Sequence, residues 1–560
     1  MPQPPALIIL GTGALATARR IQALYPSSQV YGLNERVTAD IGYNEFASQL
    51  RELYQSNRPI IALCAAGIVI RCLAPLLNAK GNEPPVLAVA EDGSAVVPLL
   101  GGLAGVNVMA REIAAELAVA PAITTSGELR FDTCVLNPPS GYVLGDIEQG
   151  KRFVSSLLGG EQVRIDGQAP WLESARLPLS EDAQLRIRIS TDAQGGDNEL
   201  LIHPRSVVVL DPPADAERIQ QALASAGISP HALACLLCPR EQMVDAALLA
   251  TAQSLGVPVR FSDELELPVE HRAQQIDDLH LAIATQPIVI HSLGQARGRL
   301  TVVGLGPGDR AFMAPAVKQA LEEAEDVLGY ETYVTMAGPF RPDQLLHNSD
   351  NREELQRSRH AFELAASGRR VVVVSSGDPG VFAMAAAVLE ALEASADAHW
   401  HRVELQVLPG ISASLATAAK AGAPLGHDFC MISLSDNLKP WDVIEKRLHH
   451  ATVADLALAF YNPISRARPW QLGRALDIVR QQRTPDTVVV LGRDIGRPAE
   501  ALSVTTLGEL TAEQVDMRTM VIIGSSTTRR FAKAGGEREW VYTPRSYPAQ
   551  EQVDSVDKSC

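Results

Sequence analysis

Three glycine-containing loops each follow an apolar run that is typical of a buried β-strand. Their sequences are GLGPGD (Gly304–Asp309), SSGDPGVF (Ser375–Phe382) and LPGISASLATAAK (Leu408–Lys420). In doubly wound folds, ligands bind beyond the carboxyl ends of the strands, and glycine lets the backbone approach a ligand closely. The loops therefore predict a ligand site, although each one alone could be only a tight turn between a strand and a helix.

The residue types narrow the chemistry of that ligand. In GLGPGD, Asp309 stands where a dinucleotide fingerprint has its third glycine, and the Lys-Ser/Thr pair of a P-loop is missing. A carboxylate beside a phosphate is also repelled by it. Asp378, between a glycine and a proline, suits a ligand that has a positive centre and a ribose but no phosphate. S-adenosylmethionine is such a ligand.

Apolar runs alternate with helical patterns along the whole chain, which predicts an α/β fold. The residues Pro84–Gly102 read as a hairpin with Asp92-Gly93 at its turn, and a helix follows it. The segment that starts at His291 is polar and contains glycine, as linkers do. A fresh strand begins directly after it, so we place the main boundary near residue 298.

Composition excludes several classes of protein. The chain has 560 residues, 46% of them hydrophobic, 20% charged, with a formal net charge of −16. This length predicts several domains, and the acidic balance argues against general binding to nucleic acid or to an anionic membrane. We find no apolar run long enough for a bilayer, no signal-peptide pattern and only scattered cysteines. We therefore expect a reduced, cytoplasmic protein.

Six motifs in the second half occur in a characteristic order. They are GLGPGD, SSGDPGVFAMA, LPGISAS, GHDFCMISLSD, FYNP and GRDIGRP. In this order they resemble the tetrapyrrole methyltransferases of cobalamin biosynthesis, and within them the ring-contracting precorrin-3B C17-methyltransferases. The resemblance covers residues 299 to 540. It implies a two-lobed methyltransferase fold, with lobes at about 299–408 and 409–545, S-adenosylmethionine in the cleft between them, and a homodimer.

The resemblance implies a reaction in two parts. The methyl group of S-adenosylmethionine moves to C17 of precorrin-3B. The ring then contracts to precorrin-4, as the C20 hydroxyl becomes a ketone and the extruded carbon remains as an acetyl group. Three alternatives stay open: cobalt-precorrin-3 as the substrate, a second activity in lactone hydrolysis, and a scaffold that binds tetrapyrroles without turnover.

The family motifs also imply roles for residues of this chain. The implied cofactor contacts are Pro307, Ser376, Gly377, Asp378, Val381, Phe382, Ser412, Ala413, Tyr461, Asn462 and Gly496. Ring contraction needs a base for the C20 hydroxyl and an acid for the leaving lactone, and the candidates in one motif are His427, Asp428, Asp436 and Lys439. Cations that could pair with the carboxylates of the substrate are Arg310, Lys439, Arg466 and Arg493. No residue set suggests a metal site.

The first half resembles the cobalamin-pathway protein that opens the lactone of cobalt-precorrin-5A. Residues 1–125 match it well as an N-terminal hydrolase-like domain, a middle region spans 126–215, and a short hydrolase-like module with the linker spans 216–290. The loop GGLAGVN has Leu103 and Ala104 where the relatives have a histidine. Because histidine is the usual group for activating water near pH 7, we expect the first half to lack appreciable hydrolase activity.

Two weaker motifs favour structural interpretations. GTGALATARR lacks the third glycine of a dinucleotide loop, so an oxidoreductase is not favoured. Cys235 and Cys238 form a lone C-x-x-C inside an apolar run. A structural zinc site needs four ligands, so we predict two buried thiols.

Overall fold

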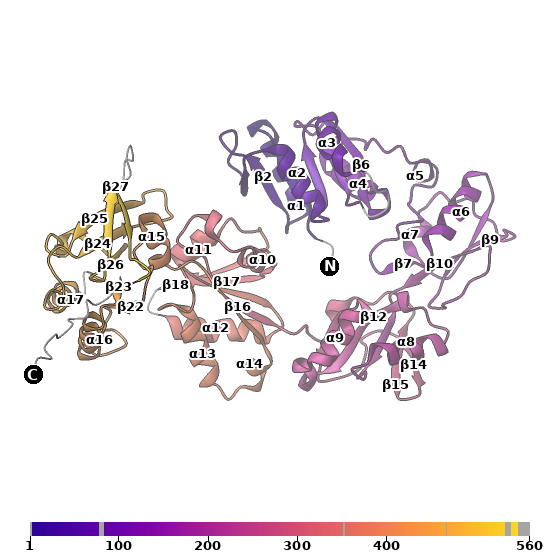
Figure 1. Cartoon of the computed structure of the whole chain (residues 1–560). Coiled ribbons are helices and arrows are strands. Elements are labelled where there is room, and N and C mark those ends of the chain that lie inside the picture. The colour runs from indigo at the N-terminus through magenta and orange to yellow at the C-terminus, as the bar shows by residue number, and fades with distance from the viewer. Residues whose placement is uncertain (1–2, 78–82, 351–352, 466–467, 533–538, 547–560) are drawn as a thin grey trace, which may run out of the picture.

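The strands of the computed structural model form six sheets within residues 3–77, 83–350, 353–465, 468–532 and 539–546, which are the residues that the structure describes. Helices flank these sheets along the chain (Figure 1). The predicted α/β, multidomain fold class is confirmed. Among the described residues, no helix has both the length and the apolar character that a bilayer crossing requires.

The first sheet is parallel except at one edge. Its strand order is β3-β2-β1-β4-β5-β6, and only β6 runs antiparallel to its neighbour. The predicted hairpin is confirmed, because β5 and β6 pair across a turn in which Gly93 has a φ of +78°. The elements are β1 (Ala6–Ile9), α1 (Leu15–Leu24), β2 (Gln29–Leu33), β3 (Ile41–Tyr43), α2 (Phe46–Gln55), β4 (Ile60–Leu63), α3 (Ala66–Leu73), β5 (Val86–Val89), β6 (Val96–Leu100) and α4 (Val106–Leu117).

Two smaller sheets follow in the chain. The second has the order β7-β10-β9-β8 and the third β13-β12-β11-β15-β14. The elements of the second are α5 (Ser126–Phe131), β7 (Tyr142–Leu144), α6 (Ile147–Leu158), β8 (Val163–Asp166), α7 (Pro170–Glu173), β9 (Leu185–Ile189) and β10 (Glu199–Pro204). Those of the third are β11 (Val207–Leu210), α8 (Ala216–Ser225), β12 (Leu233–Pro239), α9 (Ala246–Leu255), β13 (Val259–Ser262), β14 (His271–Ile276) and β15 (Leu279–Ala284).

Strand β11 corrects one expected boundary. The sequence analysis places Val207–Leu210 in the middle region, but β11 is the central strand of the third sheet and pairs with β12 and β15. Its side chains Val207 and Val209 belong to the core of that sheet. A short apolar strand carries no signal for the sheet that it joins, since that depends on partners further along the chain. We propose moving the boundary from residue 215 to about 205.

Cys235 and Cys238 are buried thiols of β12, as predicted. Neither side chain is exposed, and burial raises the pKa of each thiol to about 12. Within the described ranges, no group of three or more His, Cys, Asp or Glu residues is arranged to hold a metal ion.

The fourth sheet is fully parallel and has the order β18-β17-β19-β16-β20. Successive valines of β19 point to opposite faces of the sheet. Val371 and Val373 pack with α12 and α13, whereas Val372 and Val374 pack with α10 and α11. The elements are β16 (Arg299–Gly304), α10 (Pro315–Glu323), β17 (Asp326–Tyr330), α11 (Glu331–Ala337), β18 (Leu345–Ser349), α12 (Glu354–Ala366), β19 (Arg370–Ser375), α13 (Met384–Glu393), α14 (Ala398–Arg402) and β20 (Glu404–Leu408).

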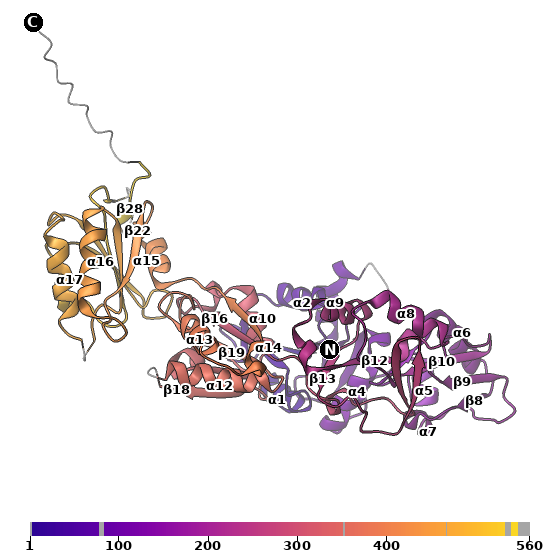
Figure 2. The ribbon, with the colours of Figure 1, turned by 90° about the horizontal axis from the view of Figure 1, so that it is seen from below.

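The fifth sheet is mixed, with the order β22-β23-β26-β24-β25, and a three-stranded sheet β21-β28-β27 completes this lobe. Figure 2 shows the orange and yellow lobe at the end of the molecule away from the indigo and violet sheets. The elements are α15 (Ala413–Ala421), β21 (Gly422–Ala423), β22 (Phe429–Ser433), α16 (Trp441–Val453), β23 (Ala457–Tyr461), α17 (Gln471–Arg480), β24 (Val488–Arg493), β25 (Ala501–Thr506), β26 (Thr519–Ile523), β27 (Arg529–Ala532) and β28 (Glu539–Tyr542).

Hydrogen bonds attach the linker between the third and fourth sheets to the elements before it and to those after it. Gln295 and Phe261 exchange both backbone hydrogen bonds at 2.8 Å, and the Gln295 side chain donates to Ala366 O at the end of α12 (3.0 Å). The guanidinium of Arg260 donates to Leu293 O and to Gly294 O, each at 2.7 Å. The polar residues that predict a linker therefore fix this connection by hydrogen bonds.

We predict that Gly298→Ala destabilises this connection. A Cβ atom on the buried Gly298 would overlap the carbonyl oxygen of Ala365 and lie 2.7 Å from its carbonyl carbon. Because backbone cannot move aside cheaply, overpacking of this kind costs roughly 1–3 kcal/mol. The expected result is a lower unfolding temperature of the full chain and faster proteolysis at the linker. The control is Gly473→Ala in α17, where a Cβ meets nothing within 4 Å. Equal stability of the two variants would contradict the prediction.

Candidate functional site

The three glycine loops meet at one edge of the fourth sheet. They follow β16, β19 and β20, and these strands are parallel neighbours, so their carboxyl ends lie together. The third loop is also the connection from the first lobe to α15 of the second lobe. The sheet topology therefore brings together segments that lie up to about a hundred residues apart in the sequence (Figure 1).

Backbone contacts between glycines hold the loops against one another. Gly306 and Gly377 exchange two hydrogen bonds, of 3.1 and 2.8 Å. A Cβ atom on Gly304 would lie 2.8 Å from the nitrogen of Gly410, and one on Gly410 would overlap the oxygen of Gly377. No larger residue fits at Gly304 or Gly410, because the neighbouring atoms are backbone.

The Asp378 carboxylate joins two of the loops. One oxygen accepts a hydrogen bond from Gly380 N at 2.8 Å, and the other accepts one from Gly410 N at 3.1 Å. The sequence analysis expects this carboxylate to serve the cofactor. In the structure both oxygens already bind backbone, although each can accept one more hydrogen bond. Asp378 therefore holds the second and third loops together and also places a negative charge at the site.

Side chains of the second lobe complete the same region. The hydroxyl of Tyr461, at the end of β23, accepts a hydrogen bond from Ser414 N (3.2 Å) and lies 2.9 Å from Ser414 Oγ. Ser414 Oγ in turn lies 3.0 Å from Ser412 Oγ, the N-cap of α15. Asn462 follows with a φ of +50° and donates from its side chain to Ser433 Oγ. The structure thus brings Ser412, Tyr461 and Asn462 together, as the resemblance implies.

Phe382 reaches from the first lobe to the second. Its ring centroid lies 5.2 Å from that of Tyr461, and its side chain is 51% exposed. Its φ of +53° is uncommon for a bulky residue, and such backbone strain clusters at functional sites. Val381, beside it, is half-buried.

A second contact between the lobes lies beside the first loop. A Cβ on Gly496, whose φ is +82°, would lie 2.8 Å from Cγ of Pro307. Arg497 donates from Nε to Pro307 O at 3.3 Å, and its NH1 lies 3.8 Å from the buried Asp494. Pro307 and Gly496 are therefore in contact, and Arg497, which the sequence analysis missed, spans the lobes. In the motif GRDIGRP, arginines stand on both sides of an aspartate, and this pattern could have predicted a role for Arg497.

The four catalytic candidates separate into two pairs. His427 and Asp428 precede β22 at its amino end, whereas Ser433 at the other end pairs with Tyr461. The strand between Phe429 and Ser433 spans roughly 13 Å at about 3.3 Å per residue. His427 and Asp428 lie at the wrong end of the strand to act with the glycine loops, so we withdraw them as catalytic candidates.

Asp436 and Lys439 lie in the loop after β22, at the same sheet edge as Tyr461. Asp436 accepts a hydrogen bond from the buried side chain of Gln471 at 3.2 Å. Lys439 Nζ lies 5.9 Å from the ring centroid of Phe382. Burial, and then the charge of Arg447, lower the pKa of the Lys439 ammonium.

The remaining predicted cations have other contacts. Arg493 forms ion pairs with Asp494 (3.2 Å) and Asp516 (2.9 Å). Arg310 donates to Gly338 O at 2.7 Å, and burial lowers the pKa of its guanidinium. Both side chains are therefore held by the protein itself. Arg466 lies outside the described residues.

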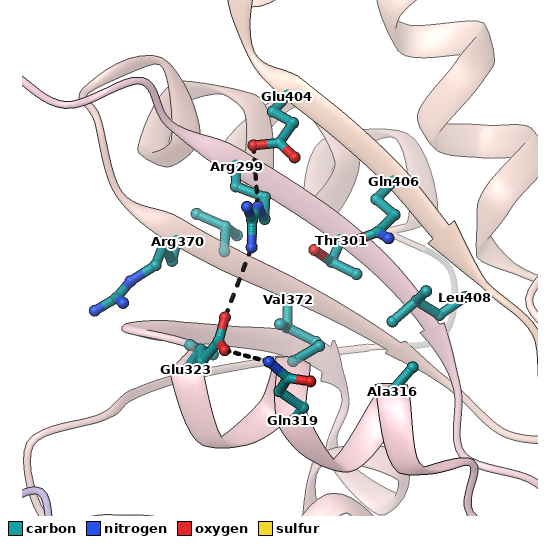
Figure 3. Close-up of a pocket in the computed structure, with 13 residues that line it drawn as sticks. Arg299, Thr301, Ala316, Gln319, Glu323, Arg370, Val372, Glu404, Gln406 and Leu408 are labelled. Atoms are coloured by element: carbon teal, nitrogen blue, oxygen red, sulfur yellow. Dashed lines mark hydrogen bonds and ion pairs between the residues drawn. The ribbon is translucent and has the colours of Figure 1, made fainter. Parts of the chain in front are cut away.

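A polar hollow lies elsewhere on the fourth sheet, under α10 (Figure 3). Its volume is about 230 Å³, and Arg299, Arg370 and Glu404, the first residues of their strands, mark the edge of the sheet opposite to the glycine loops. Arg299 pairs with Glu404 at 3.1 Å and with Glu323 at 3.6 Å. Because these charges neutralise one another, we assign no ligand to the hollow.

Comparisons with known proteins identify the families that the two halves of the chain resemble. Residues 299–511 match the family model of tetrapyrrole (corrin/porphyrin) methylases, and residues 48–128 match that of the cobalamin synthesis G N-terminal region. A precorrin-3B C(17)-methyltransferase of Sinorhizobium sp is 51% identical over 255 residues, which are 46% of this chain and 99% of that protein. The chain belongs to the tetrapyrrole methylase family. Both resemblances predicted from the sequence are confirmed.

Further relatives match nearly the same length of this tetrapyrrole methylase. The cobalamin biosynthesis protein CobIJ of Mycobacterium tuberculosis (strain ATCC 25618 / H37Rv) is 45% identical over 266 residues, 47% of this chain and 51% of that protein. A crystal structure of the methyltransferase CobJ is 53% identical and matches 44% of this chain and all of that one, with a TM-score of 0.42.

We predict that Asp378→Ala weakens both the fold and S-adenosylmethionine binding. The variant leaves the N–H groups of Gly380 and Gly410 without their acceptor, and hydrogen bonds to a charged group contribute about 1.5–3 kcal/mol. We expect a lower unfolding temperature and at least tenfold weaker binding by calorimetry. Asp378→Asn, which retains one acceptor oxygen, should be intermediate.

The matched control is Asp309→Ala. Asp309 lies in the first loop, and the one hydrogen bond recorded for its side chain among the described residues comes from Ala311 N in its own turn (2.8 Å). Its loss should leave the affinity within a few-fold of wild type. Wild-type affinity of Asp378→Ala would show that the contact between the loops is dispensable for binding.

Proposed function

We propose that the second half of the chain transfers the methyl group of S-adenosylmethionine to C17 of precorrin-3B and contracts the ring to precorrin-4, in cobalamin biosynthesis. The observation that carries the proposal is the cradle of three glycine loops closed by Phe382 and Tyr461 from the two lobes. It occurs in a chain 51% identical to a precorrin-3B C(17)-methyltransferase over 99% of that protein.

The chemistry of the cradle fits S-adenosylmethionine. The cofactor carries a positive sulfonium, and the faces of Phe382 and Tyr461 attract cations. Its ribose and amino acid part need hydrogen-bonding partners, which the backbone of Ser376 and the free lone pairs of Asp378 provide. The residues that would hold it are Pro307, Ser376, Gly377, Asp378, Val381, Phe382, Ser412, Ala413, Tyr461, Asn462 and Gly496. When bound, the cofactor supplies an activated methyl group.

The protein's own contribution is mainly positioning. In-line transfer of a reactive methyl group depends on holding two reactants at a fixed distance and angle. The two contacts between the lobes, Phe382 with Tyr461 and Pro307 with Gly496, set the width of the cleft in which both reactants lie. A homodimer remains a prediction, as does the metal-free state of the substrate.

For the first half we propose a binding or structural role. The loop with Leu103 and Ala104 has no group that takes a proton from water, and both residues are exposed. The neighbouring Asn107 donates to Glu128 at 2.6 Å, and Arg111 pairs with Glu128 at 2.8 Å. Because Asn107 and Arg111 hold the buried carboxylate of Glu128, this carboxylate is not free to act as a base at the loop. Hydrolysis of the cobalt-precorrin-5A lactone is the alternative.

The proposed function predicts methyl transfer by the full chain to precorrin-3B. The experiment supplies methyl-labelled S-adenosylmethionine with precorrin-3B, or in a second arm with cobalt-precorrin-3, and measures label and mass in the product. We expect one labelled methyl group on precorrin-3B and less than a tenth of that rate on the cobalt form. Cofactor binding without transfer to either tetrapyrrole would contradict the proposal and favour the scaffold alternative.

A further inference from the structure

Lys439 lies beside Phe382 and has no recorded counter-ion among the described residues. Among the described residues, no carboxylate is recorded within ion-pair distance of its ammonium, and the nearest recorded partner is the ring of Phe382 at 5.9 Å. Most other arginines and lysines around the second lobe pair with acids, as Arg493, Lys420 and Arg474 do. Burying part of an ammonium group without an ion-pair partner costs free energy in the folded protein. The position of Lys439 therefore calls for a functional explanation.

The surroundings of Lys439 lower the pKa of its ammonium. Burial and Arg447, on the first half of α16, both lower the pKa of the ammonium. Asp436, earlier in the same loop, is hydrogen bonded to Gln471, and the phenol of Tyr461 is occupied by Ser414. Among the described residues, no carboxylate is recorded as opposing the effects of burial and Arg447 on this pKa. Lowering the pKa of a lysine increases the fraction of neutral amine that can accept a proton.

Lys439 lies beside the proposed cofactor cradle. Its nearest recorded partner, Phe382, contacts Tyr461, and both rings belong to the proposed cofactor cradle. C20, which carries the hydroxyl, is the bridging carbon next to the ring that contains C17. A base for the C20 hydroxyl must therefore lie close to the methyl donor. His427 and Asp428 are at the other end of β22, and Asp436 is held by Gln471.

We propose that Lys439 is the general base of ring contraction, a role that rests on the proposed function of the second half. The neutral amine takes the proton of the C20 hydroxyl, so the O–H bond breaks and an N–H bond forms. The freed electron pair forms the C20 carbonyl. The C19–C20 bonding pair moves to C1, and the C1–O bond of the lactone breaks, its pair leaving on the carboxylate. The product is an isomer with an acetyl group, so no oxidant or reductant is needed.

The test separates methyl transfer from contraction in the full chain. Precorrin-3B labelled with ¹³C at C20 is supplied with S-adenosylmethionine. Mass reports methyl transfer, and the ketone resonance of the labelled carbon reports contraction. For Lys439→Gln we expect methyl transfer within a few-fold of wild type and contraction slowed by roughly 10²–10⁴. Lys439→Arg keeps the charge but cannot accept a proton near neutral pH, so it should not restore contraction.

Two further variants complete the design. Lys446→Gln removes the same charge from an exposed position of α16 and should contract at the wild-type rate. Arg447→Gln removes a charge that lowers the pKa of Lys439, so that pKa rises and less of the amine is neutral at a given pH. The acid limb of the contraction rate should then move to higher pH.

Other outcomes would overturn the assignment. Near wild-type contraction by Lys439→Gln would show that the amine is not the base. Rescue by Lys439→Arg would show that only its charge matters. An equal loss of methyl transfer and contraction in both variants would place Lys439 in substrate binding. Failure of the proposed function is distinct from all of these, because the wild-type chain would then transfer no methyl group.

Discussion

The contact between the three glycine loops is the constraint on which the rest of the candidate site depends. At Gly304 and Gly410 the loops touch through backbone atoms, so there is no room for a side chain. The parallel strands β16, β19 and β20 bring the loops to one edge, and Asp378 then joins the second loop to the third. A preformed backbone surface of this kind binds a ligand without a further cost of ordering.

The same contact connects the cradle to the second lobe. Gly410, whose N–H donates to the Asp378 carboxylate, lies in the segment between β20 and α15. In this segment the chain passes from the first lobe to the second. Two further contacts join the lobes: the ring of Phe382 packs near that of Tyr461, and Arg497 donates to Pro307 O. A few short-range contacts therefore fix the two lobes against each other, and Lys439, the proposed base in the second lobe, keeps a fixed position relative to the loops of the first.

Much of this arrangement could be predicted from the sequence, and the failures have physical causes. Apolar runs that end in glycine loops predicted the strands and their carboxyl ends, because local patterns encode local structure. The partner of Asp378 could not be predicted, since Gly410 lies 32 residues away and meets it only through the sheet. His427 and Lys439 share one motif, yet a strand separates them, so nearness in sequence misled the choice of catalytic residues. Strand β11 was assigned to the wrong region because strand pairing is non-local.

Binding of S-adenosylmethionine by Gly410→Ala tests the central role of the loop contact most directly. The added Cβ would overlap Gly377 O and lie 2.6 Å from Gly304 O, so the third loop must move away from the other two. Calorimetry on the full chain should show at least tenfold weaker binding, while the Gly473→Ala control binds as wild type does. Wild-type affinity in Gly410→Ala would show that the loops need not touch, and would contradict this account of the site.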